Sequence, residues 1–516
     1  MTSEHRAMKL RRLSEWRWYR WCHLALMTAT YITGELSHFL PGIVSRKMAQ
    51  EIHYGDIGCV ERDGVTEAVV ECYTLTDNSS CTERSQGTCE WTYTGLGFQY
   101  QLLAGPAFIG VFTVAGLVFG ALADSFNRQR LLAFSLLLLT VSTLMMGFST
   151  QYWHLVVLRM LTAAGEAGFS PLSTGMISDH FPPQLRGMAI AIFTWGIYFG
   201  YGISYVVGNY VTAADIMGKG WRWAFYVAAM PGVVITCLHL LAHDPRAGPA
   251  RRQLTHLAGE AVGDGVYQLR SPGSVSSEPP AGDAAEGRPA TPSSRSGGRW
   301  VGGRWCQLAA DKVRVFLQPS ILLLLLGASM RHTAGFCWST NTQLYFQTYY
   351  PTADLGLWLS WVSLVGGSIG VTVGGLVSDR LVKRLGLKSR VWVLSASQLL
   401  ATPFAVGTLY FAPQGCFVSL LTAYLFAEMW FGVVLAIVVE LVTPDIKSST
   451  VAIFLFIINN VGGNMPLAVD GLSRAIGYRE ALYVLYPGMY LASSVVFLMT
   501  ALALRREDTH LYSIPD

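Results

Sequence analysis

The chain has 516 residues, of which 52% are hydrophobic and 14% are charged, and its formal net charge is +4. Soluble proteins carry roughly 25% charged residues, so this composition argues against a large soluble enzyme and favours a membrane protein. The small positive charge gives no reason to expect a nucleic-acid partner.

Apolar runs of about 20 residues recur from one end of the chain to the other, and each is long enough to cross a hydrocarbon core of about 30 Å as a helix. We therefore predict an all-α membrane protein with about twelve spanning helices in a lipid bilayer. The approximate ranges are 22–43, 100–123, 131–148, 153–178, 187–211, 222–243, 317–346, 355–378, 390–412, 415–440, 449–470 and 481–504.

Basic residues gather before the first span and in alternate loops. The N-terminal segment 1–21 contains Arg11, Arg12 and Arg17, and the loop after residue 378 contains Lys383. Cytoplasmic loops carry an excess of Lys and Arg, so these loops and both termini are expected to face the cytoplasm. No cleavable signal peptide is expected before the first span.

The loop 44–98 is expected on the outside and contains four cysteines, Cys59, Cys72, Cys81 and Cys89. An even number of cysteines in an oxidising compartment predicts two disulfides, in any of three connectivities. The sequence Asn-Ser-Ser that begins at Asn78 predicts a glycosylation site. The other cysteines lie in or near spans or on the inner side, where reduced thiols are expected.

The second and eighth predicted spans end in similar sequences, GALADSFNRQR at 120–130 and GGLVSDRLVKR at 374–384. Gly120 and Gly375, like Asp124 and Asp379, are 255 residues apart, and this shared spacing indicates an internal duplication. Pairs further along keep a spacing of 262 residues, namely Glu166 with Glu428, Pro182 with Pro444 and Gly200 with Gly462.

The segment 244–314 is rich in Gly, Pro, Ser and Ala, which predicts a disordered cytoplasmic linker between two halves of six spans. Six-plus-six repeats with a substrate site at their interface describe a transporter architecture. The predicted units are an N-terminal segment 1–21, an N-terminal bundle 22–243 with its outer loop 44–98, the linker 244–314, a C-terminal bundle 315–504 and a tail 505–516.

The duplicated sequences resemble the loop motif of the major facilitator superfamily, Gly-x-x-x-Asp-Arg/Lys-x-Gly-Arg-Arg/Lys. The matching residues are Gly120, Asp124, Arg128 and Arg130 in the first copy and Gly375, Asp379, Arg380, Lys383 and Arg384 in the second. The resemblance implies the fold of that superfamily and a latch that closes the cytoplasmic side. Physically, the glycine would allow close helix packing and the charges would pair across the interface between the halves. The alternative is that these charges only set the topology.

Residues 159–193 resemble the Spinster-like branch, on Arg159, Gly165, Glu166, Ala167 and Arg186. That resemblance implies a sphingolipid or a lysophospholipid as the substrate. The branch usually has Asp-Arg-Phe in its first helix, where this chain has Ser-His-Phe at 37–39. The four-cysteine loop is more reminiscent of organic cation and anion transporters, so another small-metabolite carrier stays open.

Ionisable residues inside the spans each cost roughly 2.5 to 3.5 kcal/mol on insertion scales, so each needs a partner or a use. They are Glu35, His38, Arg159, Glu166, Arg331, His332 and Glu428. Helical rise places Glu35 and Arg159 at a similar depth, where they could pair, and Glu166, Arg331 and Glu428 near the midplane. In the superfamily these helices line the central cavity, although static ion pairs that fix helix packing are the alternative.

These residues suggest specific roles in a carrier. A proton-coupled carrier needs a buried carboxylate that can take up a proton near a cation, and Glu35 with Arg159 and His38 supplies those groups. Arg331 is expected to meet an anionic head group, while polar side chains such as Asn341 would orient the ligand. A transporter-like receptor or scaffold that binds without translocating is the other functional class.

The remaining motifs do not indicate an enzyme. The pattern Gly-x-Ser-x-Gly at 366–370 lies inside an apolar span, where close helix packing explains it better than a hydrolase site. Neither an ATP-binding loop nor a zinc motif occurs, so we expect no enzyme activity, no cofactor, no metal and no ATP. The protein is expected to be a monomer in the plasma membrane, with the lysosomal membrane as the alternative.

Overall fold

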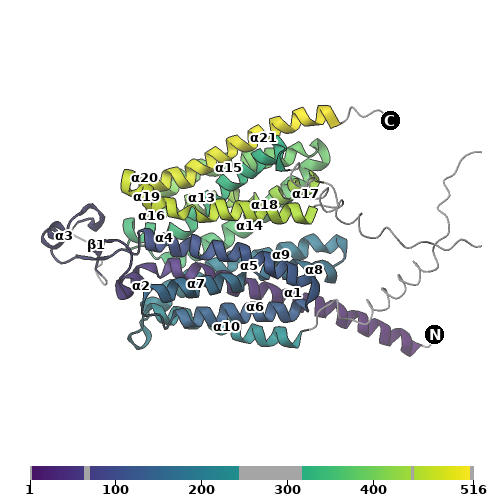
Figure 1. Ribbon diagram of the computed structural model, residues 1–516, viewed down its shortest axis with the longest axis horizontal. Helices are drawn as coiled ribbons and strands as arrows, with labels where there is room; N and C mark the ends of the chain where they lie inside the picture. Colours follow the sequence, from purple (N-terminus) through teal and green to yellow (C-terminus); the bar gives the residue numbers. More distant parts are fainter. Residues whose placement is uncertain (1–2, 63–69, 243–315, 443–446, 512–516) are drawn as a thin grey trace, which may run out of the picture. The chain divides into compact units, whose positions relative to one another are not determined.

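The computed structural model describes the backbone of residues 3–62, 70–242, 316–442 and 447–511 (Figure 1). Within these ranges the side chains of 3–17, 124, 125, 183, 184, 447–449 and 505–511 are not described. The predicted linker, the side chain of Asp124 and Pro444 therefore lie outside the described residues.

The N-terminal half is built from long helices that follow the predicted spans closely. Two spans are divided, the second at Gly105 and the fourth at Ala167 and Gly168. The helices are α1 (Ser3–Ile43), α4 (Phe98–Ala104) with α5 (Pro106–Ser125), α6 (Arg128–Met146), α7 (Tyr152–Glu166) with α8 (Phe169–His180), α9 (Pro183–Val206) and α10 (Trp221–Leu241).

The C-terminal half repeats this pattern in part. Its tenth span divides directly after Ala427, much as the fourth divides directly after Glu166, whereas the eighth span is continuous where the second is divided at Gly105. The helices are α13 (Pro319–Tyr349), α14 (Leu355–Leu385), α15 (Lys388–Tyr410), α16 (Pro413–Ala427) with α17 (Phe431–Glu440), α18 (Lys447–Asn464) with α19 (Pro466–Ile476), and α20 (Tyr478–Tyr483) with α21 (Met489–Leu511).

Among the described residues, eleven helical segments are long and apolar enough to cross a membrane. The first predicted span is not among them, although α1 runs through the bundle and buries Leu24, Met27, Leu36 and Leu40. Its polar residues lower its hydropathy, and several of them belong to the site described below. The start of α1 and the end of α21 lie at one end of the bundle, which we call the terminal end.

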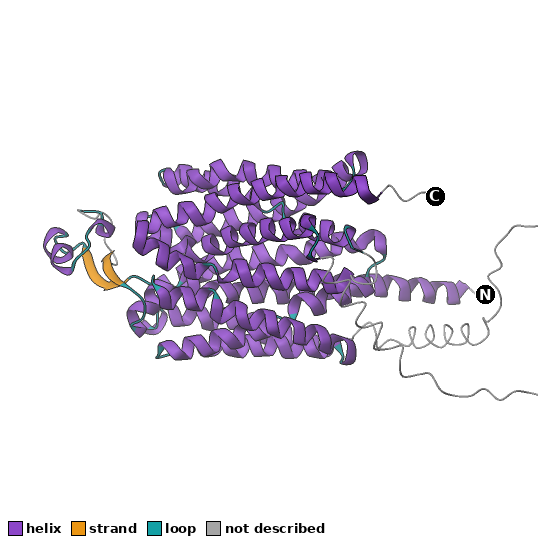
Figure 2. Ribbon diagram, turned by 45° about the horizontal axis from the view of Figure 1, so that its top comes forward, coloured by secondary structure: helices purple, strands orange, loops and turns teal. Residues whose placement is uncertain are grey.

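The opposite end carries a small subdomain, residues 53–62 and 70–97, which we call the cap (Figures 1 and 2). After the short helix α2 (Ser45–Ile52), the strands β1 (Ile57–Glu61) and β2 (Cys89–Tyr93) pair antiparallel, and α3 (Asn78–Arg84) lies between them in sequence. Disulfides join Cys59 to Cys81 and Cys72 to Cys89, which confirms the predicted set and selects one of the three connectivities. With the partly buried Trp91, the bonded cysteines form a separate small core.

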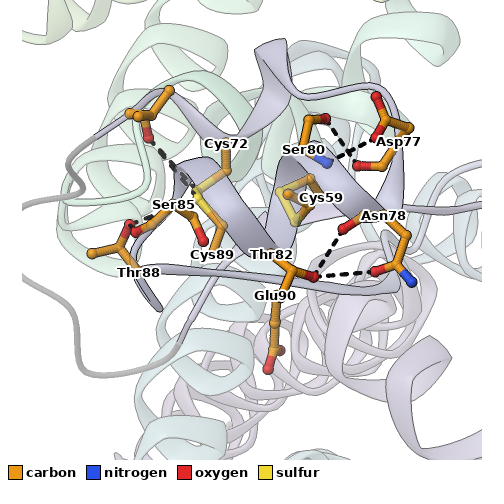
Figure 3. The surroundings of a disulfide bond; sticks show 12 residues. Cys59, Cys72, Asp77, Asn78, Ser80, Thr82, Ser85, Thr88, Cys89 and Glu90 are labelled. Carbon is orange, nitrogen blue, oxygen red and sulfur yellow. Dashed lines mark hydrogen bonds between the residues drawn. A yellow bond between two sulfur atoms is a disulfide. The ribbon is translucent and has the colours of Figure 1, made fainter.

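Asn78 is the exposed first residue of α3, and Asp77 caps this helix by accepting the Ser80 N–H at 2.8 Å (Figure 3). The backbone N–H of Ser80 and the hydroxyls of Ser79 and Ser80 hold the pKa of Asp77 below its usual range. The acceptor asparagine therefore lies on an ordered, accessible turn.

We expect glycosidase to increase the electrophoretic mobility of the wild-type protein and to leave the variant Asn78→Gln unchanged. Mass spectrometry after thiol alkylation without reduction should find the four cap cysteines blocked, because both disulfides are closed. Exposed Cys22 serves as the reactive control in the same sample. Alkylation of all four cap cysteines in folded protein would contradict the cap structure.

The cap belongs in sequence to the N-terminal half but contacts the C-terminal half. Asp56 forms an ion pair with Arg474 of α19 at 3.3 Å. The ring of Tyr73 lies 4.8 Å from that of Tyr349 at the end of α13, and the Arg479 guanidinium stacks over Tyr349 at 4.1 Å. The cap therefore bridges the two halves at this end.

Below the cap, hydrogen bonds join the halves directly. Arg46 donates to the Gln347 carbonyl at 3.1 Å and to Thr348 Oγ1 at 3.2 Å. Gln343 donates to Asn209 at 2.7 Å, and the hydroxyl of Tyr210 donates to Asp354 at 2.9 Å. The cap end is therefore closed by polar contacts between the two halves.

Candidate functional site

One group of buried ionisable side chains lies in the N-terminal half, and we call it the N cluster. It contains Glu35 and His38 of α1 and Glu166 at the end of α7, all at least 93% buried. A 3.2 Å hydrogen bond joins His38 Nδ1 and Glu166 Oε1. One imidazole nitrogen of His38 and one carboxylate oxygen from each glutamate lie within 4.8 Å of one another, so two carboxylates lie beside one imidazole.

Arg159 adjoins the N cluster but does not form the predicted ion pair with Glu35. Its Nη1 donates to the His38 carbonyl at 2.8 Å and its Nε to the Leu103 carbonyl at 3.3 Å, while Phe108 lies under the guanidinium at 4.3 Å. The prediction of that pair was therefore wrong. The backbone oxygens hold the arginine in place, and the Glu35 carboxylate lies beside Glu166 instead.

The N cluster can bind a cation. The excess of negative charge between two buried carboxylates can be relieved by one shared proton. Among the described residues, only these three His, Cys, Asp or Glu side chains form a group whose ligand atoms are close enough together to hold a metal ion. A small cavity adjoins it on the cap side, lined in part by His38, Arg159, Tyr100 and Thr340.

The second charged group, which we call the C pair, joins Arg331 of α13 to Glu428 of the tenth span. Arg331 Nη2 donates to Glu428 Oε1 at 2.9 Å and to the Ala427 carbonyl at 2.9 Å, and Nε donates to the same carbonyl at 3.2 Å. The guanidinium also lies 5.0 Å from the Trp430 ring and 4.9 Å from the Tyr490 ring. Arg331 is therefore fixed on several sides, and Glu428 is its counter-ion.

Tyr198 of α9 connects the C pair to the N-terminal half. Its hydroxyl donates to Glu428 Oε2 at 3.1 Å. Three residues earlier on α9, Trp195 Nε1 donates to Thr372 Oγ1 of α14 at 3.2 Å. The described hydrogen bonds between the halves thus extend from the cap end down to the level of the charged groups.

The two glutamates occupy equivalent places in the repeat, but their surroundings differ. A side chain at Gly200 would meet the Glu35 Cβ, and one at Gly462 would meet the His332 Cβ, so Glu35 and His332 occupy equivalent positions on α1 and α13. One residue earlier, Arg331 therefore corresponds to Gly34. A Cβ at Gly34 would lie 3.5 Å from Glu166 Cγ, so this position faces the glutamate in both halves but carries a cation only in the second.

Most of the predicted binding residues lie in the N cluster, beside it or in the C pair, namely Glu35, His38, Arg159, Glu166, Arg331 and Glu428. Asn341 does not, because it lies ten residues beyond Arg331, or about 15 Å along α13. Its Oδ1 accepts from Gln101 Nε2 of α4 at 2.8 Å, so its amide helps to close the cap end. Gln101, Trp430 and Tyr490 were not predicted, and no sequence motif marks them.

Two of the motif charges whose side chains are described form ion pairs within their own halves. Arg128 forms an ion pair with Asp179 of α8 in the N-terminal half. Asp379 accepts from Arg390 Nη1 at 2.9 Å, and Arg390 also binds Glu440 at 3.0 Å, all in the C-terminal half. The motif predicted ion pairs across the interface between the halves, but these described partners lie in the same half. Arg380 is exposed.

The two motif glycines also differ from the prediction. A Cβ at Gly120 or Gly375 would meet nothing within 4 Å, so neither is needed for close helix approach in this conformation. The expected close helix packing at Gly366 and Gly370 is confirmed, and Gly374, one turn further along the helix, shares it. A Cβ added at these glycines would lie only 2.6 to 2.9 Å from Tyr424, Leu425 and Met429 of the tenth span, so a larger residue would force the two helices apart.

Comparison with known proteins identifies a family. Residues 25–466 match the family described as Major Facilitator Superfamily. The chain is 24% identical over 373 residues to Protein spinster of Drosophila melanogaster, a match that covers 72% of this chain and 55% of that protein. It is 34% identical over 146 residues to the Sphingosine-1-phosphate transporter SPNS2 of Danio rerio, or 28% of each chain.

The match to the Probable sphingolipid transporter spinster homolog 1 of Arabidopsis thaliana is 28% identical and covers 38% of each chain. These alignments thus span between about a quarter and about half of the length of the curated relatives. Among solved structures, a bacterial homolog of human lysosomal Spinster in an inward-facing, occupied conformation has a TM-score of 0.61 at 17% identity, covering 94% of this chain and 97% of that one. A D-xylose–proton symporter has a TM-score of 0.59 at 15% identity, covering 92% and 97%, and these likenesses show a shared fold.

Proposed function

Because the chain belongs to the major facilitator superfamily, we propose that it is a carrier that moves a small amphipathic anion across a membrane by alternating access. The proposed substrate class is a sphingoid phosphate or a lysophospholipid. The names of the relatives from zebrafish and Arabidopsis support a sphingolipid. We assign the protein to the Spinster-like branch and place it in the plasma membrane, working as a monomer.

The observation that carries this proposal is the position of the buried charges. An ionisable group at the centre of a span is costly, yet Arg331 is 98% buried beside a cross-half hydrogen bond. The guanidinium fork can hold a phosphate or a carboxylate through two hydrogen bonds, and Trp430 and Tyr490 flank it with apolar rings. A site with one fixed cation and aromatic walls suits an anionic head on an apolar chain.

The N cluster supports coupling to protons. A carboxylate at Glu35 or Glu166 that holds a proton removes the repulsion between the two groups, and its release restores that repulsion. Hydrogen bonds to backbone carbonyls hold Arg159 beside them, and its guanidinium remains positively charged. We assign proton binding to this cluster and head-group binding to the C pair.

The direct test is uptake of labelled sphingosine 1-phosphate into proteoliposomes that contain the purified chain. We expect uptake above protein-free vesicles, and stimulation by an imposed pH gradient. Labelled sphingosine, which lacks the phosphate, should be moved much less. Tight binding without uptake would instead favour a receptor, and preference for a cationic or neutral solute would favour a different carrier.

The repeated motif gives a second test. The substitutions Asp124→Asn and Asp379→Asn should each slow uptake by up to about fivefold, which corresponds to the upper end of the roughly 0.2 to 1 kcal/mol of an exposed ion pair such as that of Asp379. The Asp379 substitution weakens its bond to Arg390 at the terminal end. Surface expression should remain near the wild-type level, and Glu480→Gln is the control for loss of a carboxylate elsewhere. Wild-type uptake by the double variant would exclude a latch.

A further inference from the structure

We propose that Glu428 is a displaceable counter-ion, and that an anionic head group that replaces it on Arg331 also releases Tyr198 and so loosens the contact between the halves. This inference rests on the proposed function, because it requires an anionic substrate. It adds a step in which occupancy of the site weakens the closed cap end.

The C pair has one fixed and one movable member. The side chain of Arg331 is 2% exposed, held by the Ala427 carbonyl and between two rings, and so has little freedom to move. The side chain of Glu428 is 16% exposed, and its backbone lies where the tenth span is interrupted between α16 and α17. When a second anion competes for the guanidinium, the glutamate is therefore the group that leaves.

Displacement changes a bond between the two halves. The carboxylate of Glu428 binds Arg331 through Oε1 and accepts from Tyr198 through Oε2, so one side chain serves both contacts. A carboxylate that swings away from Arg331 takes its acceptor away from the Tyr198 hydroxyl. The phenol ring cannot follow freely, because it lies against Gly367, where an added Cβ would be only 1.9 Å from the ring.

The position of the bond between Tyr198 and Glu428 indicates which end of the bundle its loss would weaken. The described contacts between the halves run from Arg46 and Thr348 near the cap down to Tyr198 and then to Trp195. Tyr198 is near the deep end of this series, at the level of the charged groups. Loss of the bond weakens the closed cap end from its inner side, next to the bound substrate.

The N-terminal repeat has no arginine at the position equivalent to Arg331. Gly34 stands where the C-terminal repeat has Arg331, so no guanidinium meets Glu166 from that position. The partner of Glu166 is His38, one turn further along α1, and both belong to the same half. The duplicated glutamates have therefore diverged, and of the two it is Glu428 that connects an anion site to the other half.

The first experiment measures affinity on the purified full chain. Glu428→Gln should bind sphingosine 1-phosphate about tenfold more tightly than the wild type, because a neutral amide competes less well than a carboxylate for the guanidinium. Affinity for sphingosine, which has no phosphate, should change less than twofold. The matched control is Glu480→Gln. This variant also removes a carboxylate from the C-terminal half, but Glu480 has no described bond to Arg331.

The second experiment measures conformation without substrate. Spin labels at Met217→Cys and Thr352→Cys report the separation of the halves at the cap end, in a background in which Cys22, Cys237 and Cys306 are replaced. Tyr198→Phe removes only the hydroxyl and should increase the open population about tenfold, the size expected for one hydrogen bond to a charged acceptor. Saturating sphingosine 1-phosphate should shift the wild type in the same direction.

These results separate the inference from the proposed function. If the wild type transported sphingosine 1-phosphate but Glu428→Gln bound it no more tightly, displacement would be refuted and the proposed function would stand. An unchanged label distance in a well-folded Tyr198→Phe variant would refute the link between the halves. A wild type that neither bound nor transported the phosphate would refute the proposed substrate class and displacement together.

Discussion

Replacing Arg331 by alanine should lower the uptake of sphingosine 1-phosphate by at least about a hundredfold, whereas lysine should give an intermediate rate. Alanine removes the cation proposed to bind the head group, and the loss of two hydrogen bonds between charged groups, at about 1.5 to 3 kcal/mol each, corresponds to at least about a hundredfold. Lysine retains the charge but loses the planar fork that can bind an anion through two hydrogen bonds. Initial rates in proteoliposomes, normalised to the reconstituted protein, measure this order.

A control is needed because Arg331→Ala also leaves Glu428 buried without its counter-ion. The double variant Arg331→Ala with Glu428→Gln removes both charges and should recover most of the thermal stability lost by the single variant. It should not recover uptake, because the anion site is still missing. Wild-type uptake by the stable double variant would show that Arg331 does not bind the substrate.

Replacing Glu35 by glutamine should abolish accumulation against a gradient and leave exchange of labelled for unlabelled substrate intact. A permanently neutral side chain cannot carry a proton through the cycle, and it also removes the repulsion from Glu166. The measurement is uptake with and without an imposed pH gradient, followed by exchange in the same vesicles.

Glu35→Asp is the matched control for this experiment, since it keeps a titratable carboxylate and should retain part of the response to the pH gradient. Undiminished concentrative uptake by Glu35→Gln would exclude Glu35 as the proton carrier. Loss of exchange as well would indicate instead that the glutamine disturbs substrate movement itself.

The arrangement of the helices could be predicted from the sequence because each span must satisfy its backbone hydrogen bonds internally and needs about 20 apolar residues. The spacing between Glu166 and Glu428 likewise predicted the repeat correctly, since a duplicated chain keeps its register. The cysteines of the cap could be grouped by compartment. Their connectivity could not be predicted, because it depends on how β1, β2 and α3 fold together.

The partners of the buried charges were harder to predict. Helical rise gave the depth of Glu35 and Arg159, but a hydrogen bond also depends on the direction in which each side chain points around its helix. Arg159 in fact uses the carbonyls of His38 and Leu103, and nothing in a sequence marks such acceptors. Arg331 and Glu428 were both placed near the midplane, yet their pairing requires the fold that brings α13 against the tenth span.

The cap has a consequence for reagents that act from outside the bundle. Its surface around Asp56 and Arg474 is assembled from both halves and exists as one epitope only while those halves are together. An antibody fragment that covers both residues would therefore recognise the closed cap end selectively. Such a fragment would hold the carrier in that state, and its binding would report the conformation without a label in the protein.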